Sequence, residues 1–235
     1  MFGVMIPGAL DASLPYASAA DGDVKSTVEI NDSTTNGPEL TNGDKFGYSV
    51  ANIGDLDGDG VNDLAVGANL DDDEGTDRGA VHIIFMNTDG SVDSTVEINS
   101  STTNGPTLSN SDFFGRSIAN IGDLNSDGVN DLAVGAYGDD DSGGARGAVH
   151  IMFMNTDGSV DSTVEINDST TNGPELTNGD KFGYSVANIG DLDGDGVNDL
   201  AVGAHQDDDE GTDRGAVHIM SVSYTHLTLP TICSV

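Results

Sequence analysis

A nine-residue acidic loop occurs three times in this chain, and its residue types are those that bind a hard metal ion. The string DLDGDGVND at Asp55–Asp63 returns unchanged at Asp191–Asp199 and, as DLNSDGVND, at Asp123–Asp131, each copy 68 residues after the one before. Oxygen-bearing side chains stand at positions 1, 3, 5 and 9, and glycine stands at position 6. Calcium-binding loops have this pattern because Ca²⁺ is coordinated by several oxygen ligands. The sequence therefore predicts one calcium site in each copy.

In each loop we expect four side-chain ligands and the main-chain carbonyl of the valine at position 7. The predicted ligands are Asp55, Asp57, Asp59, Val61 and Asp63 in the first loop, Asp123, Asn125, Asp127, Val129 and Asp131 in the second, and Asp191, Asp193, Asp195, Val197 and Asp199 in the third. The second loop has one carboxylate fewer and should bind more weakly. An ordinary turn rich in Asp, Asn and Gly is the alternative. Three copies in the same phase favour about three Ca²⁺ ions.

The residues around each loop alternate between apolar and polar types at the period of a β-strand. In the first unit we expect strands at 48–53, 64–68, 79–86 and 94–98, then a polar linker at 99–112. Position 12 of each loop is valine, where an EF-hand has glutamate, so the loop joins two strands. Four antiparallel strands and a linker, repeated, are typical of propeller blades. We predict an all-β fold with about three blades, an arc of a larger propeller.

The periodicity also sets the domain boundaries. We assign 46–113 and 114–181 to the first two blades and 182–220 to an incomplete third blade that lacks its fourth strand. Residues 21–45 contain a copy of the fourth-strand sequence, STVEIN, and are predicted to be the fourth strand and linker of a preceding blade. Residues 1–20 stay unassigned; Ala17-Ser18-Ala19 resembles a signal-peptidase site, but the segment has no basic region. Residues 221–235 are predicted to be a non-native tail, in which 222–231 looks like a translated sequencing adapter.

The composition narrows the classes of partner. A net charge of −34 argues against nucleic acid or an anionic membrane surface. No apolar run is long enough to span a bilayer, which argues against membrane insertion. The only cysteine, Cys233, lies outside the repeats, so no disulfide within the chain can stabilise the fold. We expect bound calcium to stabilise it instead.

Two dipeptides accompany every loop. Phe-Gly occurs at 46–47, 114–115 and 182–183, and Gly-Ala follows 20 residues later at 67–68, 135–136 and 203–204. This combination resembles the FG-GAP repeat of integrin alpha-chain propellers and their bacterial and archaeal relatives. The resemblance implies a loop between the first two strands of a blade that binds calcium on one face of a seven-bladed propeller. The chain departs from it at the third position of the GAP element, where Asn69, Tyr137 and His205 replace proline.

Other repeated residues carry weaker signals. Acidic runs at 71–74, 139–141 and 207–210 are expected to be solvated loops, with a second cation site as the alternative. Arg78, Arg146 and Arg214 close these loops and should pair with local aspartates. His82, His150 and His218 lie mid-strand, and we expect them to pack beside their neighbours instead of lining a channel.

The favoured function is a calcium-binding module of a secreted or cell-surface protein that acts in adhesion or in protein or glycan binding. The ligand would meet the loops at 69–77, 137–145 and 205–213, and the other partners would be the remaining blades of the parent protein or a second copy. We expect no enzymatic activity, because the serines lie in polar linkers and the histidines recur identically. The alternatives are a scaffold portion of a larger extracellular hydrolase or lyase, or an architectural surface-layer repeat.

Overall fold

The computed structural model describes residues 23–141, 143–209 and 211–223, and these residues form strands, turns and loops without a helix. The unassigned segment 1–20 and most of the predicted tail lie outside the described residues. The strands are β1 (Ser49–Gly54), β2 (Asp63–Ala68), β3 (Ala80–Met86), β4 (Val92–Ile98), β5 (Ser117–Gly122), β6 (Asp131–Ala136), β7 (Ala148–Met154), β8 (Val160–Ile166), β9 (Phe182–Gly190), β10 (Asp199–Ala204) and β11 (Ala216–Met220).

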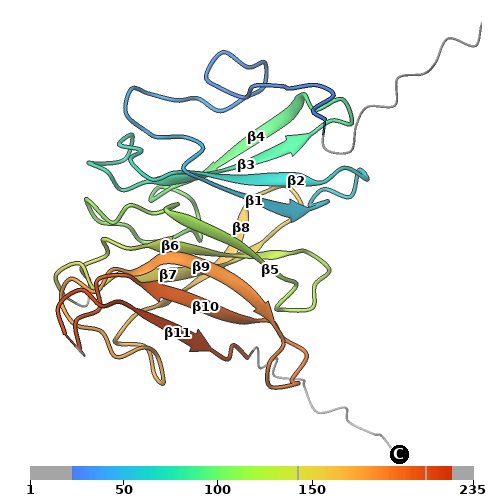
Figure 1. Ribbon diagram of the computed structural model, residues 1–235. Helices are drawn as coiled ribbons and strands as arrows, with labels where there is room; N and C mark the ends of the chain where they lie inside the picture. The colour runs from blue at the N-terminus through green and yellow to red at the C-terminus, as the bar shows by residue number, and fades with distance from the viewer. Residues whose placement is uncertain (1–22, 142, 210, 224–235) are drawn as a thin grey trace, which may run out of the picture.

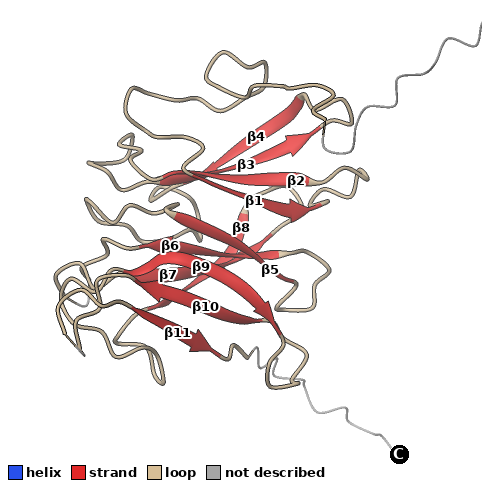
Figure 2. Cartoon of the chain, viewed as in Figure 1, coloured by secondary structure: helices blue, strands red, loops and turns tan. Residues whose placement is uncertain are grey.

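The strands form three separate antiparallel sheets, one for each sequence unit (Figures 1 and 2). Their orders are β1-β2-β3-β4, β5-β6-β7-β8 and β9-β10-β11, so each strand pairs with its neighbour in the chain. The prediction of all-β propeller blades is confirmed. The fourth strand begins at Val92, two residues before the predicted start, because a shift in register after Phe85 lets Val92 pair with Met86.

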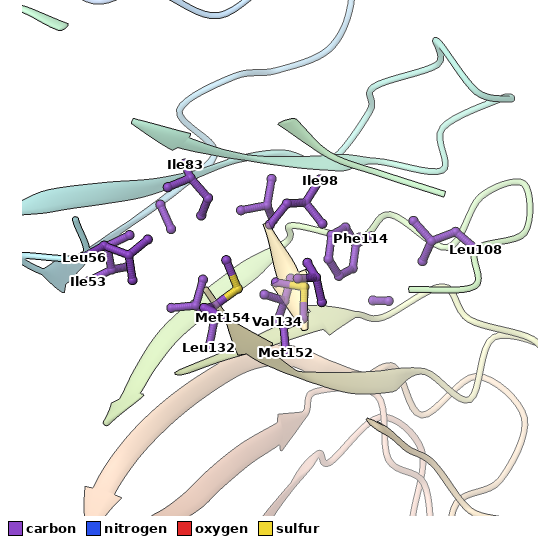
Figure 3. Close-up of a cluster of buried hydrophobic side chains, with 14 of the residues drawn as sticks. Ile53, Leu56, Ile83, Ile98, Leu108, Phe114, Leu132, Val134, Met152 and Met154 are labelled. Carbon is purple, nitrogen blue, oxygen red and sulfur yellow. The ribbon is translucent and has the colours of Figure 1, made fainter. Parts of the chain in front are cut away.

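The sheets stack face to face, and the hydrophobic core lies between them. Between the first two blades, Ile53, Ile83 and Ile98 point toward Leu132 and Met152 (Figure 3). A second cluster fills the space between blades two and three. Both faces of the middle blade are therefore covered, which explains why every residue of β6 is buried. Stacking gives each thin sheet a core that it could not form alone.

The Phe-Gly and Gly-Ala dipeptides join consecutive blades. Phe114 is fully buried and forms a parallel bridge with Gly79 of the preceding blade. The carbonyl oxygen of Gly115 accepts a hydrogen bond from the Ser49 hydroxyl at 2.7 Å. A Cβ atom on Gly67 would lie closer than 3.0 Å to that carbonyl group, so the two backbones meet only because Gly67 has no side chain. The motif thus encodes a close backbone contact between blades.

Residues 24–30 do not form a strand in this structure, although their sequence repeats that of β4 and β8. They nevertheless lie where a fourth strand would lie against the first blade. Ile30 packs against the cluster of Val66, Ile84 and Val92, just as Ile98 belongs to the cluster at the next interface. The Thr95 hydroxyl donates to the Asn36 carbonyl at 2.9 Å, and the next blade has the same bond between Thr163 and Asn104, also at 2.9 Å. The assignment of residues 21–45 to a preceding blade stays a prediction.

Candidate metal centres

Each acidic loop joins the first two strands of its blade, as the sequence predicts. In the first loop, the two carboxylate oxygens of Asp55 accept hydrogen bonds from the amides of Gly58 and Gly60, at 2.8 and 2.9 Å. Asp57 accepts from the amide of Asp59 at 3.1 Å, and Asp59 accepts from the amide of Val61 at 2.7 Å. These short-range bonds curl the backbone around the carboxylates.

The last aspartate of each loop has a structural role that the sequence did not reveal. Asp63 is the first residue of β2 and is 1% exposed. Its carboxylate accepts hydrogen bonds from the backbone amides of Leu56 at 2.8 Å and Met86 at 3.0 Å. Asp131 accepts the amides of Leu124 and Met154 in the same way, at 2.8 and 3.1 Å. One carboxylate therefore holds the hairpin loop to the end of the third strand.

The environments of these three aspartates affect their charge differently. Burial raises the pKa of Asp131 to about 6 and also raises the pKa of Asp63. The pKa of Asp199 is lowered, chiefly by the hydrogen bond from the Leu192 amide. A bound cation would favour the ionised form of all three carboxylates.

The structure brings together three of the predicted ligands in two of the loops. Oxygen atoms of Asp55, Asp57 and Asp63 lie within 4.8 Å of one another, and so do those of Asp191, Asp193 and Asp199. Calcium lies about 2.3–2.6 Å from each oxygen ligand, so two of its ligands can be no more than about 5 Å apart. The carboxylate positions fit that requirement.

The remaining predicted ligands lie in the loops but outside these two sets. Asp59 and Asp195 are exposed, and their carboxylates accept the amides of Val61 and Val197 at 2.7 and 2.8 Å. In the second loop, the carboxylate of Asp123 accepts the amides of Asp127 at 3.0 Å and Gly128 at 2.8 Å. The side-chain amide of Asn125 donates to Asp127 at 2.8 Å, and Asp127 accepts the Val129 amide at 2.8 Å.

The loops also make contacts between blades. Asn130, at position 8 of the second loop, donates its side-chain amide to the carbonyl of Ile53 in the first blade at 2.9 Å. Asn198 makes the equivalent bond to Ile121 at 3.0 Å. An ion that holds the second or third loop in shape would therefore also support the interface with the preceding blade.

Aromatic and cationic side chains gather where the Phe-Gly dipeptides begin each blade. The residue after Phe-Gly is Tyr48, Arg116 or Tyr184, and the Arg116 guanidinium lies 4.5 Å from the centre of the Tyr48 ring and 3.8 Å from that of Tyr184. Tyr137 stacks on Phe113 with ring centres 4.9 Å apart, and it lies 5.3 Å from the Tyr184 ring. We call Tyr48, Phe113, Arg116, Tyr137 and Tyr184 the aromatic–cationic surface. The sequence signal for it was the Tyr-Arg-Tyr alternation at one repeat position.

The predictions for the repeated histidines and arginines are confirmed only in part. His82, His150 and His218 pack against the rings of Phe46, Phe114 and Phe182, with ring centres 5.3–5.5 Å apart, which confirms packing. Arg146 forms an ion pair with Asp168, an aspartate of the following linker. The prediction is wrong for Arg78, which donates instead to Asn110 at 3.1 Å and Ser100 at 3.2 Å, because a serine stands where the second linker has Asp168.

Comparison with known proteins gives one consistent family. A family model described as the FG-GAP repeat matches residues 46–84, 114–152 and 182–220. The chain is 36% identical over 163 residues to integrin alpha-PS5 of Drosophila melanogaster, and 35% identical over 162 residues to integrin alpha-6 of Gallus gallus. Each alignment covers 69% of this chain but only 15% and 14% of the two relatives. None of the described residues belongs to a helix that is long and apolar enough to cross a membrane.

Proposed function

Because the chain belongs to the FG-GAP repeat family, we propose that it is a calcium-binding β-propeller module of a secreted or cell-surface protein, acting in adhesion by binding a protein or glycan. The observation that carries the calcium assignment is the group formed by Asp55, Asp57 and Asp63, together with its repeat in the third blade. All three groups are carboxylates, the ligands that calcium prefers. The integrin alpha relatives support a location outside the cell, which is part of the proposal.

The role of the ion is structural. Bound calcium would neutralise like charges that otherwise repel one another, and it would hold the hairpin in one shape. Asp59, Val61 and their counterparts complete the proposed ligand sets. Because the unfolded chain has no such site, each ion stabilises the folded state by mass action, by about 1.4 kcal/mol at a concentration tenfold above its dissociation constant. Extracellular modules bind calcium at about 10⁻⁴–10⁻³ M.

The aromatic–cationic surface is our candidate for ligand binding. Tyr137 lies in one of the loops predicted to contact a ligand, and Tyr48 is 48% exposed. Aromatic faces and a guanidinium suit a sugar ring or an anionic group of a protein. Few other places in so acidic a chain offer a positive charge, because it has 7 Lys and Arg against 41 Asp and Glu.

The rest of the parent protein, or a second copy, would complete the ring. Among the described residues no strand pairs with the outer edge of β11, whose Val217 and Ile219 are 68% and 59% exposed. A groove of about 930 Å³ beside this edge is lined by apolar residues of β7, β8 and β11. A fourth strand from outside the described residues would fill this place.

A non-catalytic module accounts for the sequence better than a hydrolase or lyase scaffold. The first and third units are identical over Ser26–Ala68 and Ser162–Ala204, whereas an active site needs residues that one blade alone provides. An architectural surface-layer repeat is the remaining alternative. The integrin alpha relatives favour an adhesion role over it.

The calcium assignment is tested by thermal unfolding of the whole chain in calcium and in EDTA. We expect calcium to raise Tm and EDTA to abolish the rise. Asp57→Asn with Asp193→Asn should remove about 3 kcal/mol of the calcium stabilisation, because two sites lose a carboxylate. The matched control is Asp93→Asn with Asp161→Asn, which removes the same charge from exposed positions of β4 and β8. An unchanged Tm on addition of calcium would end the assignment.

A further inference from the structure

Each of the first two blades contains a second group of carboxylates at the end opposite its hairpin loop. β2 runs from the calcium loop at Asp63 to Ala68, and the next turn brings Asp71 and Asp73 to Glu97 of β4. One oxygen from each of these three side chains lies within 4.8 Å of the others. The second blade repeats the group with Asp139, Asp141 and Glu165.

The central aspartate of each group is buried with an oxygen that nothing satisfies. Asp71 is 2% exposed; one oxygen accepts the Asp73 amide at 3.2 Å, and the other is buried without a hydrogen-bond partner. Asp139 is 1% exposed and has the same arrangement, with the Asp141 amide at 3.2 Å. The expectation of a solvated acidic run is therefore wrong for these two residues. A buried carboxylate oxygen without a partner is costly, so each of these atoms is a candidate ligand atom.

A fourth buried carboxylate lies near the group in the second blade. Asp112, from the linker that precedes Phe114, is 1% exposed. One of its oxygens accepts the Ser109 amide at 2.6 Å, and the other is buried and unpartnered. Asp112 and Glu165 are also the two charges that act most strongly on Asp139. A second buried, unpartnered carboxylate oxygen thus lies in a different segment of the chain, close enough for the charge of Asp112 to act on Asp139.

No positive side chain among the described residues neutralises these groups. The one ion pair between described residues joins Arg146 to Asp168, outside both groups. His82 and His150 lie directly opposite Glu97 and Glu165 in the sheets, but burial lowers the pKa of each to about 4, so both are neutral at pH 7. Among the described residues, these carboxylates therefore have no cationic partner.

We propose that Asp71, Asp73 and Glu97 bind one divalent cation, and that Asp139, Asp141 and Glu165 bind another with the help of Asp112. The donors are all carboxylate oxygens, and their spacing fits the reach of about 2.3–2.6 Å from ion to ligand that Ca²⁺ requires. The glutamate comes from the outer strand and the aspartates from the loop after the second strand. The ion therefore ties the outer strand to that loop, and each complete blade is held by an ion at both ends.

The third blade supplies an internal comparison. Asp207 and Asp209 repeat the two aspartates, but the glutamate would come from a fourth strand, and none of the described residues forms one beside β11. The chain should therefore bind two ions at these groups, and not three.

Equilibrium dialysis against radioactive Ca²⁺, with the whole chain first stripped by EDTA, tests the proposal. Asp71→Asn with Asp139→Asn should lower the number of bound ions by two. Asp72→Asn with Asp140→Asn is the matched control, because it removes the same charge from exposed neighbours and should change nothing. An equal number of ions in the two double variants would overturn the proposal. The hairpin-loop variant Asp57→Asn with Asp193→Asn should keep these two ions, so a failure of the loop sites is seen separately.

Thermal unfolding shows whether a variant loses bound ions only because it no longer folds. In EDTA, Asp71→Asn with Asp139→Asn should melt at or above the wild-type temperature, because it removes buried charge that has no partner. In calcium its rise in Tm should be smaller than that of the control. If this variant fails to fold, Glu97→Gln with Glu165→Gln must lose the same two ions for the proposal to stand.

Discussion

The contact between the backbones of consecutive blades makes a sharp prediction for Gly67→Ala. A Cβ at this position would come closer than 3.0 Å to the carbonyl group of Gly115 in the next blade, a distance that real Cβ atoms essentially never show. Gly67 itself has an ordinary backbone conformation, so the cost arises from the neighbour and not from strain in the alanine. Gly203 is the matched control. It occupies the same strand position in the third blade, and the three atoms nearest to its Cβ all belong to Ser185 of the same sheet.

The expected loss of stability depends on which atoms must move to make room for the new Cβ. Both glycines share a clash with a serine hydroxyl. The Ser185 hydroxyl beside Gly203 can rotate away, whereas moving the Ser49 hydroxyl beside Gly67 also breaks its hydrogen bond to the Gly115 carbonyl. At Gly67 a backbone carbonyl must also retreat, and it belongs to the segment that Phe114 anchors in the core. Overpacking of a rigid core costs about 1–3 kcal/mol. We therefore expect Gly67→Ala to lower the free energy of unfolding by about 3 kcal/mol and Gly203→Ala to lower it by about 1 kcal/mol or less.

Urea unfolding followed by far-UV circular dichroism measures both values, in EDTA so that ion binding does not contribute. The chain has no tryptophan, so fluorescence would depend on its 5 tyrosines. Gly135→Ala should behave like Gly67→Ala, because its Cβ would meet the carbonyl of Gly183. Equal losses for Gly67→Ala and Gly203→Ala would refute the stacking of the blades as described.

Three further predictions concern single side chains. Asp131→Ala should cost about 3 kcal/mol even in EDTA, because the amides of Leu124 and Met154 lose a buried acceptor, whereas Asp127→Ala should be nearly neutral under the same urea assay. The pKa of His150 is lowered by burial from 6.5 to about 4, so its neutral form contributes stability that is complete above pH 6.5 and is lost as the pH falls toward 4. Wild type should therefore lose about 3 kcal/mol more than His150→Leu between pH 7 and pH 4, and an equal loss would show that His150 is not desolvated. Asn125→Asp should tighten calcium binding at the second loop by adding a carboxylate; calcium titration followed by calorimetry would show no change if that loop does not bind.

The sequence predicted the blades well because each strand pairs with its neighbour in the chain. Local alternation and the acidic loops were then enough to place eleven strands to within a few residues. Residues 26–30 repeat the STVEI sequence of β4 and β8 but form no strand here, because a strand needs a pairing partner and no described strand pairs with them. Their assignment to a preceding blade is still a prediction.

The site was harder to predict where a residue acts through a distant part of the chain. The sequence predicts Asp63 as an oxygen ligand, but its hydrogen bond from the amide of Met86 depends on the pairing of strands, which spacing does not reveal. The burial of Asp71 depends likewise on the linker and β4 that surround it. The contact of Arg116 with Tyr48 and Tyr184 joins three blades. It depends on how the blades stack, which the local sequence pattern does not reveal.

The measurement that bears most directly on the central claim is the number of calcium ions bound by the folded, EDTA-stripped chain in millimolar Ca²⁺. Equilibrium dialysis should find three ions in the hairpin loops and two in the groups around Asp71 and Asp139. A chain that keeps its β-sheet circular dichroism and takes up no calcium would contradict the account.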